Sequence, residues 1–278
     1  MTVFRSGIPS GTGLGLRRSL LSELLESESV VADFLELAPE NWIGVGGRLG
    51  RRLRALTERY PLVCHGLSLN LAGSAPLSQR LLTDVRRFLD EHNVAAYSEH
   101  LSACGDHAQL YDLLPVPFTD ENVMRIAGRI HQVEDALQRP LIIENVSAYL
   151  TLPGQMSEAE FVCAVLEEAD CQLLLDVNNA YVNSVNLGGD PFEFIQAMPS
   201  ERVAYLHMAG HFDAEPGLKI DSHGAAVADP VWQLLEQTYG LHGVRPTLLE
   251  RDFNIPALSE LLPELQRIRA LQTGRVAA

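Results

Sequence analysis

Residues 140–177 read PLIIENVSAYLTLPGQMSEAEFVCAVLEEADCQLLLDV, and this stretch decides the fold. Two short apolar runs, PLIIEN (140–145) and QLLLDV (172–177), flank an amphipathic pattern, SEAEFVCAVLEEA (157–169). Ser157 and Glu160 have the spacing of a capping box, which marks the start of a helix. A strand–helix–strand order joins two parallel strands through a right-handed crossover. The stretch therefore predicts one βαβ unit of an α/β protein.

The same alternation continues in both directions along the chain. Further strand-like runs are GLGL (13–16), DFLEL (33–37), PLVCHG (61–66), AAYSEH (95–100), VAYLHMAG (203–210) and PTLLER (246–251). Helical patterns include SQRLLTDVRRFLDEH (78–92), TDENVMRIAGRIHQVEDAL (119–137) and two that begin with Asp-Pro at Asp190 and Asp229, where the acid is expected to cap the helix. Eight strand–helix units in about 250 residues predict a closed (β/α)8 TIM barrel. We expect residues 1–278 to form this single domain.

Charge and cysteine content limit the partners and the compartment. The formal net charge is −15, and nonspecific affinity for nucleic acid comes mainly from Lys and Arg meeting phosphates, so a nucleic-acid partner is not expected. The cysteines at positions 64, 104, 163 and 171 form no CxxC pair, and the N-terminal residues lack the apolar core of a signal peptide. No apolar run reaches the roughly 20 residues of a membrane span. We therefore expect a cytoplasmic protein with no membrane partner.

Polar residues, most of which can bind metal, follow the predicted strands at their carboxyl ends. They are His65, Glu99, His100, Glu144, Asn145, Asp176, His207, Glu250 and Arg251, and the segment after the seventh strand adds His211, Asp221 and His223. In a barrel these ends share one rim, where charged groups are costly to bury unless they are paired or bind metal. A metal centre explains six such strand ends more simply than six independent buried networks do.

The residue types restrict the metal. Imidazole and carboxylate without thiolate favour zinc, iron or manganese over magnesium alone. The set is larger than one ion needs, which predicts two or three ions with Glu144 well placed to bridge. Asp221 and His223 point the same way from an extended segment and can together hold one ion. Oxidation chemistry and metal-assisted hydrolysis both stay open on these grounds.

Longer motifs then indicate a family. They are HGLSLNLAG (65–73), SEHLS (98–102), DLLPVPFTDE (112–121), IIENVSAYL (142–150), LLLDVNNAYVN (173–183), YLHMAGH (205–211) and IDSHG (220–224). In this order they resemble the multinuclear non-haem iron-dependent oxidative enzymes, formerly catalogued as domain of unknown function 692 and similar to UPF0276 proteins. The resemblance extends from about Gly11 to about Leu262.

This resemblance implies a fold and a reaction. The family fold is a TIM barrel of the xylose-isomerase-like group. One relative converts a peptide cysteine to an oxazolone and thioamide in methanobactin, and another excises the β-carbon of a C-terminal cysteine in 3-thiaglutamate biosynthesis. The implied function is oxidative modification of cysteine in a ribosomally synthesised precursor peptide. The implied cofactors are two or three iron ions in a mixed Fe(II)/Fe(III) state, with O2 as cosubstrate and a separate leader-binding protein as partner.

The related three-metal endonuclease barrels have ligands in the same strand order, which suggests an assignment. One ion is held by His65, His100 and Glu144, a second by Glu144, Asp176, His207 and Glu250, and a third by Asn179, Asp221 and His223. Asn179 replaces a histidine of the endonucleases, so the third site is expected to hold its ion less tightly. His207 is preferred to His211 because it lies within the strand, which leaves His211 as a catalytic base. Residues expected to orient the ligands are Glu99, Asn145, Asn178 and Arg251.

Three other functions are weighed against this one. A phosphodiesterase of the endonuclease IV type fits the ligand order, but the acidic chain is poorly suited to a DNA backbone. A sugar isomerase with two divalent ions would need a lysine beside the metals, and the obvious lysine is Lys219. A nonenzymatic subunit that carries metal and binds a leader peptide is the third alternative.

Overall fold

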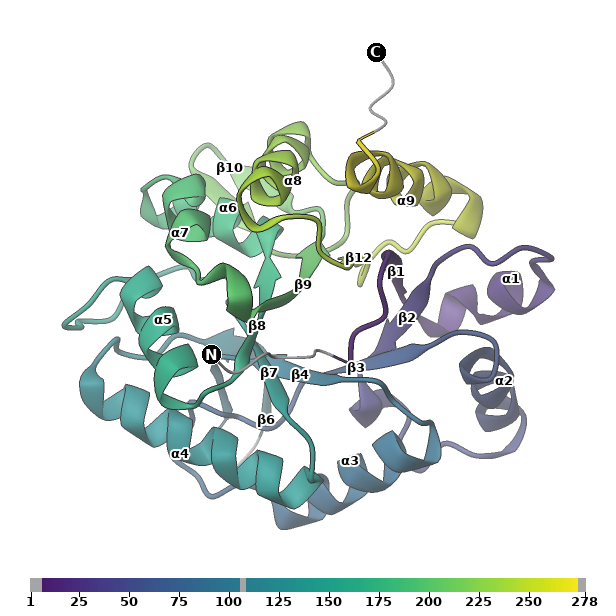
Figure 1. Cartoon of the computed structure of the whole chain (residues 1–278), viewed down its shortest axis with the longest axis horizontal. Coiled ribbons are helices and arrows are strands. Elements are labelled where there is room, and N and C mark those ends of the chain that lie inside the picture. The colour runs from purple at the N-terminus through teal and green to yellow at the C-terminus, as the bar shows by residue number, and fades with distance from the viewer. Residues whose placement is uncertain (1–6, 106–108, 275–278) are drawn as a thin grey trace.

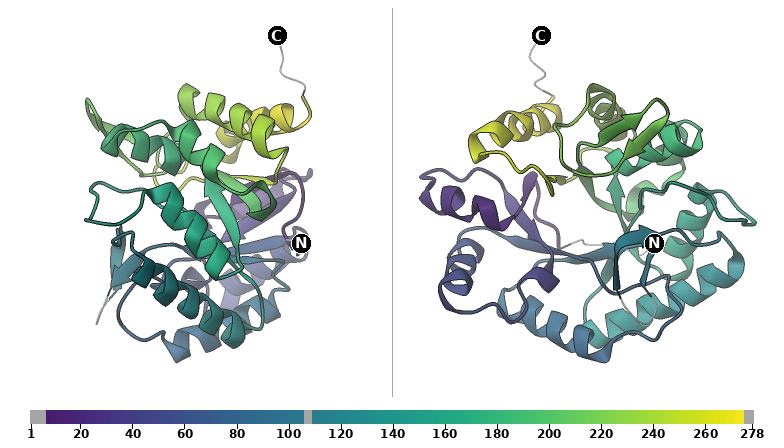
Figure 2. Two further views of the ribbon diagram at one scale, coloured as in Figure 1. Left: turned by 60° about the vertical axis from the view of Figure 1, so that its left-hand side comes forward. Right: turned by 180° about the vertical axis from the view of Figure 1, so that it is seen from behind.

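Eight parallel strands close into a barrel within residues 7–105 and 109–274, the parts of the chain that the computed structural model describes (Figure 1). The order around the barrel is β1–β12–β9–β8–β7–β4–β3–β2. Neighbouring strands pair in parallel all the way round. Figure 2 shows the helices around the barrel from two further directions. The (β/α)8 barrel predicted from the sequence is confirmed.

The barrel strands coincide with the predicted apolar runs to within two residues at the amino end. They are β1 (Thr12–Gly15), β2 (Phe34–Leu37), β3 (Leu62–Gly66), β4 (Tyr97–His100), β7 (Leu141–Glu144), β8 (Gln172–Asp176), β9 (Val203–Met208) and β12 (Thr247–Leu249). Two hairpins at the carboxyl end of the barrel were not predicted. They are β5 (Ala103–Gly105) with β6 (Gln109–Leu114), and β10 (Phe212–Glu215) with β11 (Leu218–Ile220).

The helices begin mostly where the sequence places their caps. They are α1 (Leu21–Glu26), α2 (Gly47–Thr57), α3 (Gln79–Glu91), α4 (Asp120–Leu137), α5 (Glu158–Glu168), α6 (Val177–Leu187), α7 (Pro191–Ala197), α8 (Asp229–His242) and α9 (Leu258–Gln272), with 3-10 turns η1 (Arg18–Leu20), η2 (Pro39–Asn41) and η3 (Ser200–Arg202). The capping box of Ser157 and Glu160 is present at α5, and Asp190 caps α7. The prediction for Asp229 is wrong, because α8 starts one residue earlier and Asp229 is its first helical residue. None of the helices in the described residues is both long and apolar enough to cross a membrane.

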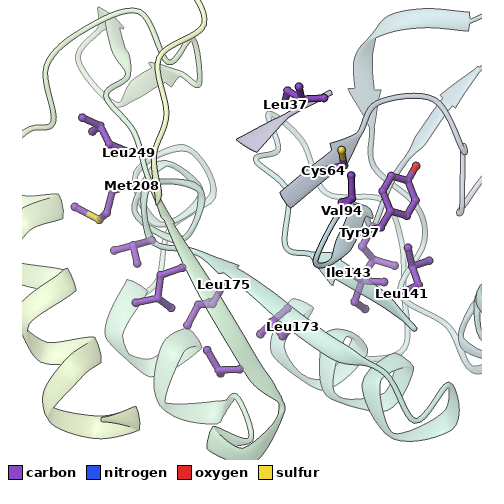
Figure 3. Close-up of a cluster of buried hydrophobic side chains, with 14 of the residues drawn as sticks. Leu37, Cys64, Val94, Tyr97, Leu141, Ile143, Leu173, Leu175, Met208 and Leu249 are labelled. Carbon is purple, nitrogen blue, oxygen red and sulfur yellow. The ribbon is translucent and has the colours of Figure 1, made fainter. Parts of the chain in front are cut away.

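Side chains of the barrel strands alternate between an outer and an inner face. On the outer face, Leu141 and Ile143 of β7 and Leu173 and Leu175 of β8 belong to the large cluster between barrel and helices (Figure 3). A smaller cluster fills the barrel interior with Ile8, Phe34, Val63, Ile142, Leu174, Ala204, Tyr205 and Leu248. This interior is tightly filled at Gly13, where a Cβ atom would lie 2.4 Å from the Phe34 ring.

A polar layer lies directly above this apolar interior. Six inner positions are each followed, two residues later, by a residue that can bind metal: Glu36 after Phe34, His65 after Val63, Glu144 after Ile142, Asp176 after Leu174, His207 after Tyr205 and Glu250 after Leu248. The side chains of all six polar residues are buried. Because a strand repeats every two residues, the alternation that fills the barrel also directs these groups into its carboxyl-terminal mouth.

Candidate metal centre

The first ligand group joins β3, β4 and β7. His65 Nε2 lies 3.1 Å from His100 Nε2 and 3.1 Å from Glu144 Oε2, and His100 Nε2 lies 3.3 Å from the same carboxylate oxygen. Three ligand atoms therefore converge on one point with their mutual distances suited to sharing a cation. This is the trio that the sequence analysis assigned to one ion.

The backbone and Glu99 orient the imidazole of His100. His100 Nδ1 lies 3.0 Å from the carbonyl oxygen of Gly66 and 3.2 Å from Glu99 Oε1, so its Nε2 faces the trio. Burial lowers the pKa of His100, but the hydrogen bond to Glu99 and the charge of Glu144 outweigh it and raise the pKa to about 9. Glu99 is fixed in turn by the amides of Ser68 and Leu69. Glu99 thus orients a candidate ligand, as the sequence analysis expected.

The second ligand group is centred on His207 of β9. Its Nδ1 lies 3.1 Å from Glu250 Oε2, 3.3 Å from Glu144 Oε1 and 3.9 Å from Asp176 Oδ2. Glu144 therefore presents one oxygen to the His65–His100 pair and the other to His207. Although burial raises the pKa of Glu144 in the metal-free protein, the nearby His65 and His100 charges lower it below its usual range. An ionised carboxylate in this position can bridge two ions.

Asp176 ends β8 and caps α6. Its Oδ1 accepts a hydrogen bond of 2.7 Å from the backbone N–H of Asn179, while its own N–H donates to Asn145 Oδ1. The sequence analysis predicted no helix after Asp176, yet α6 begins with the next residue. Burial and the neighbouring Glu144 charge raise the pKa of Asp176 well above its usual value. Metal-free protein therefore holds this carboxylate at a cost.

The third group involves His223 and its acidic neighbours. His223 Nε2 lies 2.7 Å from Asp221 Oδ1, and its Nδ1 lies 3.5 Å from Glu250 Oε2 and 3.1 Å from Asp252 Oδ2. Asp221 is held by Asn178 Nδ2 at 2.9 Å and by the Ser147 hydroxyl at 2.9 Å. The structure thus brings Asp221 and His223 together as the two-residue spacing predicts.

Asn145 and Asn179 are hydrogen-bonded to each other and to Asp176 of the second group. Asn179 Nδ2 donates to the Asn145 carbonyl oxygen at 3.0 Å, which leaves Asn179 Oδ1 buried without a hydrogen-bond partner. Asn179 and Asp221 line the same cavity as His223. The free amide oxygen is the only ligand type that Asn179 can offer a metal ion.

The residues present fit a multinuclear metal centre. Buried atoms without a hydrogen-bond partner in the described residues include Asp176 Oδ2, Asn179 Oδ1, both ring nitrogens of His207 and His223 Nε2. The His207 nitrogens approach carboxylates closely but off the direction of a ring N–H. Each unsatisfied buried group costs about 1–3 kcal/mol, so several in one cluster point to a missing partner. Nitrogen and carboxylate donors without thiolate suit iron, zinc or manganese.

Two of the predicted site residues lie apart from the ligand groups. His211 Nδ1 lies 2.8 Å from Asn178 Oδ1, so His211 reaches the third group only through Asn178 and Asp221. Arg251 points to the opposite face of its segment from Glu250 and pairs with Glu264 of α9 at 2.7 Å. Arg251 therefore does not orient a ligand directly.

The sequence analysis missed three residues of the site. Glu36 Oε1 lies 2.9 Å from His207 Nε2, and Arg17 contacts both Glu250 and Asp252. Glu36 had a signal: it lies two residues after Phe34 in DFLEL, on the inner face of the strand. Arg17 and Asp252 lie in connecting segments, where no periodicity fixes the direction of a side chain.

A cavity of about 120 Å³ leads from the barrel mouth to the ligand groups. His65, His100 and Glu144 line its base, and Trp42, Leu67 and Leu113 line its apolar side. The cavity is large enough for a small group beside the candidate ligands, and apolar side chains line part of it.

Solved structures with little sequence similarity share the fold of this chain. D-psicose 3-epimerase from Clostridium cellulolyticum H10 has a TM-score of 0.60 at 11% identity, covering 95% of this chain and 96% of its own. 3-Keto-D-glucoside 4-epimerase from E. coli has a TM-score of 0.61 at 11% identity, covering 95% of this chain and 99% of its own. At these identities the likeness shows the fold alone, a xylose-isomerase-like TIM barrel, as predicted.

Closer relatives identify the family. The model for RiPP precursor modification enzymes of the MbnB/TglH/ChrH type matches residues 11–273, where RiPP denotes a ribosomally synthesised and post-translationally modified peptide. A UPF0276 protein of Pseudomonas aeruginosa is 64% identical over 263 residues, covering 95% of this chain and 93% of its own. One from Shewanella amazonensis is 56% identical over 269 residues, covering 97% of each. The chain therefore belongs to the MbnB/TglH/ChrH family, which confirms the resemblance carried by its motifs.

Proposed function

We propose that this protein is an iron- and O2-dependent oxidoreductase that modifies cysteine in a ribosomally synthesised precursor peptide during natural product biosynthesis. The observation that carries the proposal is Glu144, whose two oxygens face two ligand groups at the base of a cavity. A carboxylate that bridges two groups of histidine and carboxylate ligands suits a centre with more than one redox-active metal ion. Family membership supplies the peptide substrate class.

The residues of the chain have distinct parts in this proposal. Bound iron would supply a site for the substrate thiolate and the electrons that reduce O2. The proposed ligands are His65, His100, Glu144, Asp176, Asn179, His207, Asp221, His223 and Glu250. Trp42, Leu67 and Leu113 line the entrance and would exclude water from the cysteine side chain. Arg17 holds the Glu250 carboxylate at 2.8 Å and so fixes the second group.

We further propose a cytoplasmic setting and a separate leader-binding partner protein. All of the cysteines, at positions 64, 104, 163 and 171, carry free thiols, which suits a reducing compartment. The cavity admits a side chain rather than a folded peptide, so a partner that presents the precursor is consistent with its size.

The structure offers less support to the alternative functions. A sugar isomerase would need a lysine at the metals, but Lys219 extends from β11 and pairs with Asp213 of β10. For a phosphodiesterase, the net charge of −15 opposes binding of a polyanionic backbone.

The proposal is tested with anaerobically purified protein reconstituted with Fe(II), together with a cysteine-containing precursor peptide and a partner protein sought among the products of the genes that neighbour its own. Mass spectrometry should show a modified precursor only when iron and O2 are both present, and no change when the precursor cysteine is alanine. Glu144→Gln should abolish the modification, whereas Asp190→Asn, a conservative change of an exposed helix cap, should retain it. Equal activity with Zn(II) in the absence of O2 would refute the proposal.

A further inference from the structure

A row of buried polar side chains connects His65 to His207. His65 Nδ1 lies 2.7 Å from Ser98 Oγ, and Ser98 Oγ lies 2.7 Å from the Tyr205 hydroxyl. Tyr205 donates a hydrogen bond of 2.8 Å to Glu36 Oε2, and Glu36 Oε1 lies 2.9 Å from His207 Nε2. Ser98 and Tyr205 are fully buried and Glu36 is 2% exposed. The row therefore lies inside the barrel, with Ser98 and Tyr205 below the ligand layer and Glu36 within it.

The direction of the hydrogen bonds follows from Glu36. Tyr205 has a single hydroxyl hydrogen, and it donates that hydrogen to Glu36 Oε2. The Tyr205 oxygen then accepts from Ser98, and Ser98 Oγ accepts from His65 Nδ1. His65 consequently carries its hydrogen on Nδ1 and keeps a lone pair on Nε2, the atom that faces His100 and Glu144.

Glu36 also acts directly on His207, where it favours the other arrangement: the hydrogen on Nε2 and the lone pair on Nδ1. Glu36 Oε1 lies 2.9 Å from His207 Nε2 but off the direction of a ring N–H, so the contact is electrostatic rather than a hydrogen bond. At this distance the carboxylate still attracts a hydrogen on Nε2 and repels a lone pair there. The lone pair is then left on Nδ1, which faces Glu144 and Glu250 at 3.3 and 3.1 Å. The Nδ1 lone pair and the Glu144 and Glu250 carboxylates repel one another unless a cation lies between them, so this arrangement favours a bound metal ion.

We propose that Glu36 is a positioning residue that selects the metal-binding nitrogen of both histidines: Nδ1 of His207 through direct contact, and Nε2 of His65 through Tyr205 and Ser98. The inference rests on the metal centre of the proposed function but not on its redox chemistry. Glu36 is also close enough to His207 and Glu250 to be a ligand itself. The positioning role is preferred because both oxygens of Glu36 already have partners. Oε2 accepts the hydrogen bond from Tyr205, and Oε1 lies beside His207 Nε2, the ring nitrogen away from Glu144 and Glu250. Loss of such an outer partner usually weakens metal affinity by about 10- to 100-fold.

The first test identifies the nitrogens directly. Protein with 15N-labelled histidine is loaded with Zn(II), and long-range proton–nitrogen NMR spectra assign the protonated nitrogen of each ring. Hydrogen on Nε2 of His207 and on Nδ1 of His65 is expected. Zinc bound through His207 Nε2 or His65 Nδ1, or no zinc bound at all, would overturn the proposal.

The second test separates the two arms of the row. Tyr205→Phe removes the link to Ser98 but leaves Glu36 facing His207, so one Zn(II) should weaken by about 10- to 100-fold in chelator competition while the other is retained. Glu36→Gln should weaken both ions. Tyr239→Phe is the matched control, since that buried hydroxyl contacts Thr247 at 2.5 Å on the outer side of the barrel, and it should change neither affinity.

Alternative outcomes are decisive as well. Unchanged Zn(II) affinity at both sites in Tyr205→Phe would overturn the proposal. The proposal would also fail if Tyr239→Phe weakened Zn(II) binding as much as Tyr205→Phe does, because the effect would then come from general packing. If Tyr205→Phe does not fold, Ser98→Ala cuts the same arm and carries the same expectation for the His65 ion alone. Protein that binds Zn(II) as described but leaves the precursor unmodified would refute the proposed function and leave this inference standing.

Discussion

Replacing Asp176 with asparagine should stabilise the metal-free protein. Asp176 is fully buried, its Oδ2 has no hydrogen-bond partner, and Glu144 lies beside it with the same charge. Asparagine keeps the oxygen that accepts from the Asn179 N–H, and asparagine and aspartate cap helices about equally well. The change therefore removes an unfavourable buried charge and preserves the cap of α6.

The expected gain follows from the cost of an unsatisfied buried group, about 1–3 kcal/mol. Part of that cost remains with the asparagine amide, so we expect the free energy of unfolding to rise by about 1–2 kcal/mol. For 278 residues the entropy of unfolding is about 0.6 kcal/mol/K, which converts the gain to about 2–3 °C in Tm. Metal at 100 times its Kd would stabilise the wild type by about 2.7 kcal/mol per site and reverse the order.

Thermal melts at pH 7 with EDTA and with excess Zn(II) measure both effects. Asp176→Asn should melt above the wild type in EDTA and below it in Zn(II). Asp190→Asn, the exposed cap of α7, should follow the wild type in both conditions. A variant that melts below the wild type in EDTA would refute the view that this carboxylate is held at a cost for metal binding.

Other predictions address the bridge, the third site, a titrating acid and the barrel interior. Glu144→Gln should lower the bound metal by about two ions per chain in elemental analysis, because its oxygens face two groups, and a loss of one ion would contradict the bridge. Asn179→His should tighten the third ion in chelator competition, and a weaker ion would count against that ligand assignment. Burial raises the pKa of Glu158 from 4.5 to about 7, so the folded state binds the proton more tightly. Relative to Glu158→Gln, wild-type stability in urea unfolding should fall as pH rises from 4.5 to 7, by up to about 3 kcal/mol. Gly13→Ala would place a Cβ 2.4 Å from Phe34 and should cost about 1–3 kcal/mol, lowering the urea midpoint at an unchanged m-value.

Most of the barrel could be predicted because its strands are buried on both faces. Such strands read as short apolar runs, for instance LIIE in β7 and QLLLD in β8, and the helices between them carry clear caps. Helix α6 escaped prediction because VNNAYVNSVNL is rich in asparagine and valine, which form helices weakly. The residue that could have indicated the start of α6 is Asp176, which ends β8, caps α6 and is also a candidate ligand.

The site was predictable where a strand end fixes the direction of a side chain. His65, Glu144 and His207 come together because they share the inner face with the apolar residue two positions earlier. Glu36 follows the same rule, but it was not predicted because the run DFLEL (33–37) ends on the apolar Leu37 and so shows no polar residue at its end. Arg251 was assigned to the site by proximity to Glu250, although adjacent residues of an extended segment point in opposite directions.

In the proposed function, a multinuclear iron centre oxidises a peptide cysteine with O2. The most direct measurement is the mass of the precursor peptide after incubation with Fe(II)-reconstituted protein and its partner, with and without O2, beside the iron content per chain. We predict two or three iron ions per chain and a mass change, located at cysteine, that requires O2. An unchanged cysteine with a full iron complement and O2, or a modification that proceeds equally without O2, would contradict the claim.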